Sequence, residues 1–263
     1  MTSRTARAGS RVGRRPLSSL LLLLALAAGC ATVPPARQPV DGPALRALGL
    51  LDERWQTFTD LRALADVVLQ KGGERQRLTG VLLVKGPDSV RFEALSPFGQ
   101  PYFLVVVHAG RLTAYDAAKN EALVGPATAE TIARVLGLPL DADDLVAVLA
   151  GRAVPPKDLR RAELLPPDAT GPSLNLVGAV QHQRVWMDLE TGEVRQVEIA
   201  GGPVPVTITY RRDGQTPAGF DLDAGQAYIT GSVTYRNAVV GAGIEPDRFT
   251  LALPKGAKIQ SIR

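Results

Sequence analysis

Three aspartates in one short stretch are the residues of this 263-residue chain that come nearest to a metal site. Asp141, Asp143 and Asp144 offer carboxylate oxygens, which are ligands for hard cations. They also stand at the start of an apolar helical pattern, where aspartate satisfies free backbone N–H groups and suits the positive end of a helix. Because the stretch lacks further oxygen ligands and the glycine of an EF-hand, we expect helix capping and predict no metal site.

The two histidines are the other candidates for chemistry, as general bases. His108 ends an apolar stretch and His182 stands in Gln-His-Gln, and neither lies near a serine or cysteine motif that would supply a nucleophile. Carboxylate pairs such as Glu93 with Asp66 or Glu198 are available in any β-protein. We therefore predict no catalytic residue, no enzymatic activity and no cofactor.

The net charge of +4 suggests an anionic partner only until the positions of the charges are considered. The first fifteen residues contain five arginines and no acid, and the rest of the chain has 25 basic against 26 acidic residues. Aromatic residues make up 5% of the chain, too few for a surface on which bases stack. The sequence therefore predicts no nucleic-acid partner.

The single cysteine, Cys30, follows an apolar run and closes the sequence Leu-Ala-Ala-Gly-Cys. The run from Leu17 to Ala28 is shorter than the ~20 residues that a spanning helix needs, which indicates a signal-peptide core. A buried thiol is the alternative reading of Cys30, but the proline-rich stretch that follows offers nothing to bury it. The sequence up to Cys30 resembles the lipobox of bacterial lipoproteins.

That resemblance implies removal of residues 1–29, a diacylglycerol on the Cys30 thiol and an acyl chain on its new amino group. Three acyl chains, at about 0.8 kcal/mol for each buried methylene, would anchor the protein to a membrane without spanning it. Ala31 stands where the best-known retention signal has aspartate, so by resemblance to the enterobacterial sorting rule we expect the periplasmic face of the outer membrane. Residues 30–43 would be the lipidated cysteine and a proline-rich tether, and residues 44–263 a single domain.

The pattern after the tether is mainly that of β-strands. Leu45, Leu48, Leu51, Trp55 and Phe58 recur at spacings of three and four, which predicts an amphipathic helix over 44–58. Apolar runs bounded by turn signals predict roughly ten strands or a few more. They cover residues 64–69, 78–84, 90–95, 101–107, 111–115, 173–180, 183–189, 193–199, 204–210, 226–235 and 249–253. We expect a mainly β (α+β) domain, in which a curved antiparallel sheet forms a barrel or half-barrel and helices close one side.

Two short helices interrupt the strands in the middle of the chain. Thr128 is a predicted N-cap, and Gly137 ends the first helix. Asp141 is the predicted N-cap of the second helix, which ends by Gly151. Their apolar faces consist of Ile132, Val135 and Leu136 in the first helix and Leu145, Val148 and Leu149 in the second.

The turn Ser-Pro-Phe-Gly-Gln at residues 96–100 has a bulky apolar residue at its tip. Pro97 and Gly99 supply the turn geometry and leave Phe98 as the only large side chain. Two readings of Phe98 are open: the ring folds back over the core, or it enters a membrane or contacts a lipid.

Three stretches, in this order, resemble the LolB lipoprotein receptors of the LolA/LolB carrier group. They are the strand and turn at 90–103, the helix that ends in Gly-Leu-Pro-Leu at 137–140, and the helix that ends in Leu-Ala-Gly at 149–151. The likeness covers 78–154, and residues 249–256 resemble the closing strand of the group. Between about 155 and 245 only a β pattern is visible.

This resemblance implies an unclosed β-barrel with a helical lid over an apolar cavity that takes the acyl chains of lipoproteins. Those chains and a LolA-type periplasmic carrier are the implied partners of a monomer that needs no nucleotide or metal and passes its cargo to the outer membrane. Family members carry a protruding apolar residue, a leucine in the best-known ones, where this chain has Phe98. The implied membrane-contact loop is Pro97, Phe98 and Gly99, and the implied lid residues are Ile132, Val135, Leu136, Leu145, Val148 and Leu149.

Three functions remain open at this point. The protein accepts or carries lipoproteins, binds another lipid or amphiphile, or is a structural outer-membrane lipoprotein with a filled barrel. The aliphatic composition suits an apolar cavity and a packed core equally well, so composition does not separate them.

Overall fold

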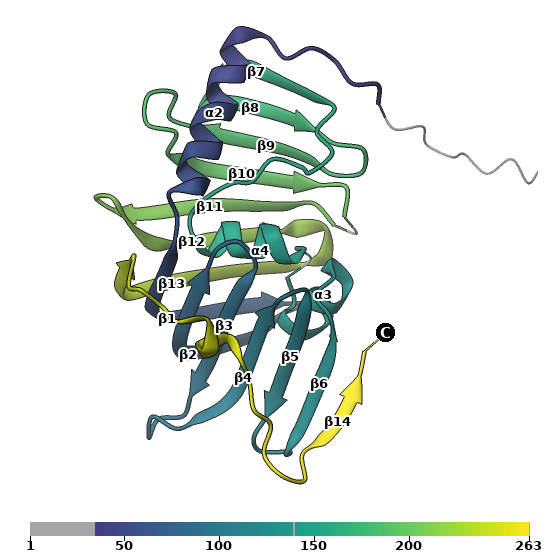
Figure 1. Ribbon diagram of the computed structural model, residues 1–263, viewed down its shortest axis with the longest axis vertical. Coiled ribbons are helices and arrows are strands. Elements are labelled where there is room, and N and C mark those ends of the chain that lie inside the picture. The colour runs from purple at the N-terminus through teal and green to yellow at the C-terminus, as the bar shows by residue number, and fades with distance from the viewer. Residues whose placement is uncertain (1–34, 139, 203, 263) are drawn as a thin grey trace, which may run out of the picture. The chain divides into compact units, whose positions relative to one another are not determined.

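One sheet of fourteen strands dominates the computed structural model, which describes residues 35–138, 140–202 and 204–262 (Figure 1). The strand order is β14-β6-β5-β4-β3-β2-β1-β13-β12-β11-β10-β9-β8-β7. The first six strands form an antiparallel meander with short connections. They are β1 (Asp60–Lys71), β2 (Glu74–Lys85), β3 (Ser89–Leu95), β4 (Pro101–His108), β5 (Arg111–Asp116) and β6 (Glu121–Pro126).

The next seven strands form a second antiparallel meander. The two meanders join because β1 also pairs with the last strand of the second one, β13, in antiparallel register. The last strand of the chain, β14 (Lys258–Ser261), pairs in parallel with β6. The second meander consists of β7 (Arg161–Asp168), β8 (Gly171–Val177), β9 (His182–Met187), β10 (Val194–Ala200), β11 (Val206–Asp213), β12 (Thr216–Ala224) and β13 (Ile229–Val240).

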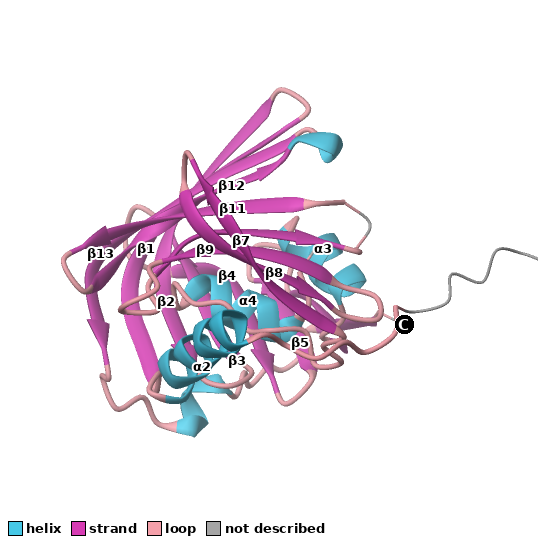
Figure 2. Ribbon diagram, turned by 90° about the horizontal axis from the view of Figure 1, so that it is seen from above, coloured by secondary structure: helices cyan, strands magenta, loops and turns pink. Residues whose placement is uncertain are grey.

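This topology explains where the two middle helices lie. The β6 and β7 strands stand near opposite edges of the sheet, so the chain between them must cross a whole sheet face. That crossing carries α3 (Ala129–Leu136) and α4 (Ala142–Leu149). Seen from above, the sheet curves around these helices and around α2 (Gly42–Gln56) (Figure 2). The prediction of a mainly β fold with a curved, unclosed sheet and helices on one side is confirmed.

The local signals at the helix ends are also confirmed. The Thr128 side chain accepts a hydrogen bond from the backbone N–H of Thr131, and Gly137 ends α3 in the left-handed conformation at φ 73°. Asp141 accepts from the N–H of Asp144 at 2.9 Å and begins α4. None of the helices in the described ranges has both the length and the apolarity of a membrane-spanning helix.

The N-terminal helix α2 forms where expected but buries a different face. Its Ala44, Ala47 and Leu51 are buried, whereas Leu45 is 60% exposed, so the assignment of Leu45 to the buried face is wrong. The small alanines let the helix axis approach β7, against which α2 packs. The segment that precedes α2 already contacts the rest of the domain, because the N–H of Gln38 donates to the carbonyl of Arg160.

Strands β6, β7, β12 and β14 were not predicted from the pattern, and the predicted strand at 249–253 is wrong. Phe249 ends a 3-10 turn, η3 (Pro246–Phe249), and packs with Leu83, Val106 and Ile244 on the sheet face opposite the helices. Asp60 positions this segment, since its carboxylate accepts from the N–H groups of residues 242–244. The apolar residues of the segment thus cover a sheet face and do not pair at an edge.

A glycine on β12 is required by the close approach of β13. Gly219 has φ +126°, and a Cβ there would overlap the carbonyl oxygen of Val233. We expect Gly219→Ala to lower the free energy of unfolding by about 3 kcal/mol or more, measured by urea titration. Gly214→Ala in the adjacent turn is the control, because a Cβ there meets no atom within 4 Å. Equal losses in the two variants would contradict this prediction.

Candidate functional site

The apolar sheet face under the lid helices, α3 and α4, is the candidate site. The structure places Ile132, Leu145, Val148 and Leu149 in the buried core, and Val135 and Leu136 half-buried against it. The α3 helix contacts β5, and α4 contacts β2. All six predicted lid residues therefore pack toward the sheet. Their role as a lid that opens stays a prediction.

The first turn of α4 is attached to the sheet through a buried carboxylate. Asp144 accepts hydrogen bonds from the side-chain amides of Gln181 and Gln183, the latter at 3.1 Å. Burial, aided by the negative charges of Asp141 and Asp143, raises the pKa of Asp144 to about 7 against the two amide hydrogen bonds that lower it. The two amide hydrogen bonds favour the ionised carboxylate, but burial outweighs them, so the folded protein is more stable when Asp144 is neutral.

The other end of α4 is attached through carbonyl groups of its last residue and of the segment that follows it. The Tyr235 hydroxyl donates to the carbonyl of Leu149 at 2.9 Å, and the Tyr210 hydroxyl donates to that of Arg152 at 2.9 Å. Arg212 donates to the carbonyl of Gly151 at 3.4 Å. Burial raises the pKa of both tyrosines, so both hydroxyls stay protonated as donors. Helix α4 is thus held by polar contacts at each end and by apolar contacts between them.

The space around α4 is filled. Two pockets flank the helix, one at Val148 and Phe220 and the other at Asp144 and Ile199. Neither has room for a water molecule. At these two places an acyl chain can therefore enter only if α4 moves away from the sheet.

The turn between β3 and β4 projects its apolar residue into solvent. The N–H of Gly99 donates to the carbonyl of Ser96 at 2.9 Å, and the N–H of Ser96 donates to that of Gln100 at 2.8 Å. These bonds define a tight turn with Pro97 and Phe98 in the centre and Gly99 at φ 78°. Phe98 is 92% exposed, so its ring does not fold back over the core.

The other residues considered for chemistry are Cys30, His108 and the possible metal ligands. Cys30 and the signal sequence lie outside the described residues. His108 lies 2.7 Å from the Ser89 hydroxyl, a contact that sequence spacing did not reveal. The Ser89 hydroxyl donates to its neighbour Asp88, so the carboxylate does not orient the histidine as it does in a catalytic triad. In the described part of the chain, no three histidine, cysteine, aspartate or glutamate side chains are arranged so that they could hold a metal ion.

The contacts that hold α4 were also missed. Gln181, Gln183, Tyr210 and Tyr235 come from strands and turns far along the chain, and their types alone carry no signal for this role. The only hint was the acidic run that contains Asp144, which we interpreted as capping alone.

Solved structures share this arrangement of a curved sheet and covering helices. A domain from Vibrio parahaemolyticus described as an outer membrane lipoprotein-sorting protein superposes with a TM-score of 0.56 at 15% identity, over 78% of this chain and 97% of that one. A LolA superfamily protein from Nitrosomonas europaea gives a TM-score of 0.56 at 13% identity, over 79% and 97%. The chain has a LolA-like fold.

A DUF1329 family protein from Desulfovibrio piger shares the LolA-like fold, with a TM-score of 0.53 at 13% identity over 80% of this chain and 98% of that one. No protein-family model and no curated protein matches the sequence. The likeness to these structures is one of fold, and it does not single out LolB.

Proposed function

We propose that this protein is a lipid-anchored envelope protein that takes acyl chains of lipoproteins under α3 and α4 and passes them to the outer membrane. The observation that carries the proposal is an apolar sheet face covered by two eight-residue helices, one of which is held at its ends by a few hydrogen bonds. An acyl chain can take the place of such a helix against the apolar sheet face.

The energetics allow such an exchange without an external energy source. A sixteen-carbon chain that leaves water gains on the order of 12 kcal/mol, at about 0.8 kcal/mol for each methylene. Each hydrogen bond at an end of α4 contributes only about 1 kcal/mol net. The displaced residues, chiefly Leu145, Val148 and Leu149, must find another apolar cover, and the acyl chain itself can supply it.

The proposed location rests on the resemblance of the sequence up to Cys30 to a lipobox, and the proposed partner is a LolA-type periplasmic carrier. Two proteins with the same fold are described as an outer membrane lipoprotein-sorting domain and a LolA superfamily member, which supports an envelope role. The exposed Phe98 supports membrane contact, since an apolar ring at a turn tip can enter the interfacial region of a bilayer.

A second candidate function is that of a structural lipoprotein that transfers nothing. The filled space beside α4 favours it, because a permanently packed interior would hold no ligand. The two candidates differ in whether the lid helices open in solution.

Capture of a labelled triacylated lipoprotein by residues 35–263, followed by native mass spectrometry, separates these functions. Stoichiometric capture is expected. Capture of free phospholipid alone would indicate a carrier of other lipids, and capture of neither would favour the structural lipoprotein.

Loosening α4 should speed this capture. Tyr235→Phe removes the donor to the carbonyl of Leu149, and we expect a capture rate about fivefold higher, the equivalent of about 1 kcal/mol. The control is Tyr115→Phe, which removes a hydroxyl contact to Asn120 at the β5–β6 turn. An unchanged rate for Tyr235→Phe, or an equal rise in both variants, would argue against opening of α4.

A further inference from the structure

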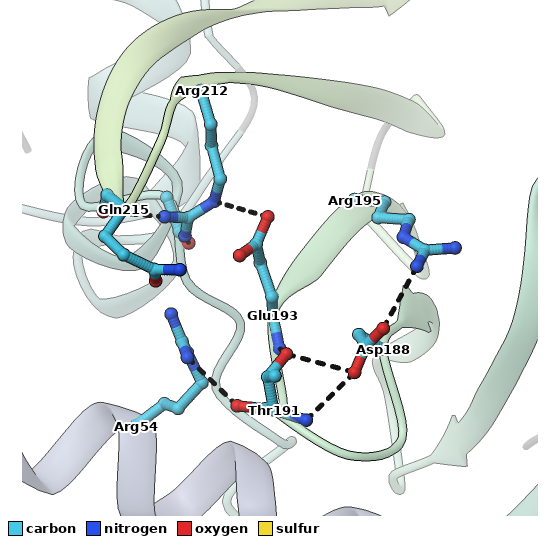
Figure 3. Close-up of polar contacts among 8 residues, drawn as sticks. Arg54, Asp188, Thr191, Glu193, Arg195, Arg212 and Gln215 are labelled. Carbon is cyan, nitrogen blue, oxygen red and sulfur yellow. Dashed lines mark hydrogen bonds and ion pairs between the residues drawn. The ribbon is translucent and has the colours of Figure 1, made fainter.

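Three arginines meet where α2, the segment after α4 and strand β11 come together. Arg54 lies in the last turn of α2, Arg152 follows the end of α4, and Arg212 lies on β11. Figure 3 shows Arg54 and Arg212 on the same side of Glu193, the residue that directly precedes β10. We call Arg54, Arg152 and Arg212 the arginine cluster.

The arginine cluster uses only some of its N–H donors. Arg54 donates from Nη1 to the carbonyl of Thr191 at 2.9 Å, and Arg212 donates to the carbonyls of Gln215 at 3.1 Å and Gly151 at 3.4 Å (Figure 3). Arg212 Nε lies 3.2 Å from a carboxylate oxygen of Glu193, an ion pair without the alignment of a hydrogen bond. These contacts thus use only some of the N–H donors of the three guanidinium groups.

Several buried N–H groups in the cluster have no acceptor. These are Nε of Arg54, Nε and Nη1 of Arg152, and Nε of Arg212. An unpaired buried N–H of a charged group costs more free energy than one of a neutral group. Burial and the positive charges of Arg54 and Arg212 lower the pKa of Arg152 to about 10, and Glu193 opposes this only in part.

The charges of the arginine cluster favour an anionic ligand. Three positive charges face one carboxylate, so the cluster carries an excess of two positive charges at a partly buried place. Guanidinium groups recognise phosphate oxygens through paired N–H donors, and phosphate carries up to two negative charges near neutral pH. A phosphate group would match both the charge and the unused donors.

We propose that Arg54, Arg152 and Arg212 form a binding site for a phosphate group, carried by an anionic lipid headgroup or present as free phosphate. The site adjoins the end of α4 but does not depend on the proposed function, because its arginines do not belong to the apolar face that α3 and α4 cover. Failure of lipoprotein capture would therefore leave this proposal standing.

Isothermal titration calorimetry on the full chain in a nonionic detergent tests the site with three probes. They are inorganic phosphate, dihexanoylphosphatidylglycerol and the zwitterionic dihexanoylphosphatidylcholine. We expect Arg152→Gln to weaken binding of phosphate or of the anionic lipid at least tenfold. The matched control, Arg195→Gln, removes an arginine of the same region that is paired with Asp188, and should change affinity less than twofold (Figure 3).

Thermal unfolding without ligand separates a binding role from a structural one. Because Arg152 is repelled by its neighbours and lacks acceptors, Arg152→Gln should leave the Tm of the ligand-free protein unchanged or raise it. Arg54→Gln tests the site from another helix if Arg152→Gln does not fold, with the same expected loss of affinity.

Binding of phosphate alone would identify a free-phosphate site, and binding of the anionic lipid alone a headgroup site. The proposal is overturned if neither probe binds, if the variants bind like the natural protein, or if Arg152→Gln lowers the Tm by several degrees. Equal affinity for the two lipids that Arg152→Gln does not change would also overturn it, since the short acyl chains and not the arginines would then drive binding.

Discussion

Asp144→Asn is expected to stabilise the protein at pH 8 by up to about 4 kcal/mol, since each unit of pKa shift is worth about 1.4 kcal/mol. Burial raises the pKa of Asp144 from an ordinary 3.8 to about 7. A carboxyl of raised pKa contributes stability that is complete below pH 4 and is lost as the pH rises through 7. Asparagine keeps the shape and stays neutral, so the variant should lose this dependence.

The surroundings of Asp144 support a neutral replacement. Its neighbours are the amides of Gln181 and Gln183 and the acidic residues Asp141 and Asp143, and the Gln183 side-chain oxygen has no hydrogen-bond partner. An asparagine amide can donate to that oxygen after rotation of the Gln183 side chain. The change removes one negative charge from the first turn of α4, which costs about 0.5 kcal/mol and reduces the gain slightly.

Urea unfolding at pH 4.5, 6 and 8 measures the effect. Asp143→Asn is the matched control, because Asp143 lies in the same turn but is more exposed and pairs with Lys157. The natural protein and the control should lose stability between pH 4.5 and 8, whereas Asp144→Asn should change far less. A parallel pH dependence in all three proteins would show that Asp144 is ionised throughout this range.

Phe98→Glu is expected to reduce delivery of lipoprotein to a membrane at least tenfold while leaving capture unchanged. Phe98 is 92% exposed on a turn whose backbone bonds do not involve its side chain, so the substitution should not affect folding. A carboxylate at the tip opposes entry into the bilayer interface, whereas the apolar ring favours it. Transfer of labelled lipoprotein to vesicles, with captured cargo as the starting point, measures the effect.

Two variants make the Phe98 test specific. Phe98→Leu keeps an apolar tip and should transfer normally, and Val180→Glu places the same charge at another exposed apolar position, in the turn between β8 and β9. If Phe98→Glu transfers cargo as fast as Val180→Glu, the turn does not contact the membrane.

The sequence by itself determined the features that depend on near neighbours along the chain. Thr128, Gly137 and Asp141 mark helix ends because each acts on backbone groups within about four residues. The exposed Phe98 turn depends likewise on adjacent Pro97 and Gly99. Apolar runs bounded by turn signals located most strands, since a turn depends on residues that are adjacent in the sequence.

The tertiary structure decided what depends on partners far apart in the chain. The pairing of β1 with β13 joins residues that are more than 150 positions apart, and no local pattern encodes which strands meet. The burial of Asp144, the tyrosine contacts to α4 and the arginine cluster arise only because the chain crosses the sheet face between β6 and β7. Composition allowed an open cavity or a filled core alike. The packing of α4 against the sheet fills the space beside this helix, since close packing depends on side-chain shapes in three dimensions.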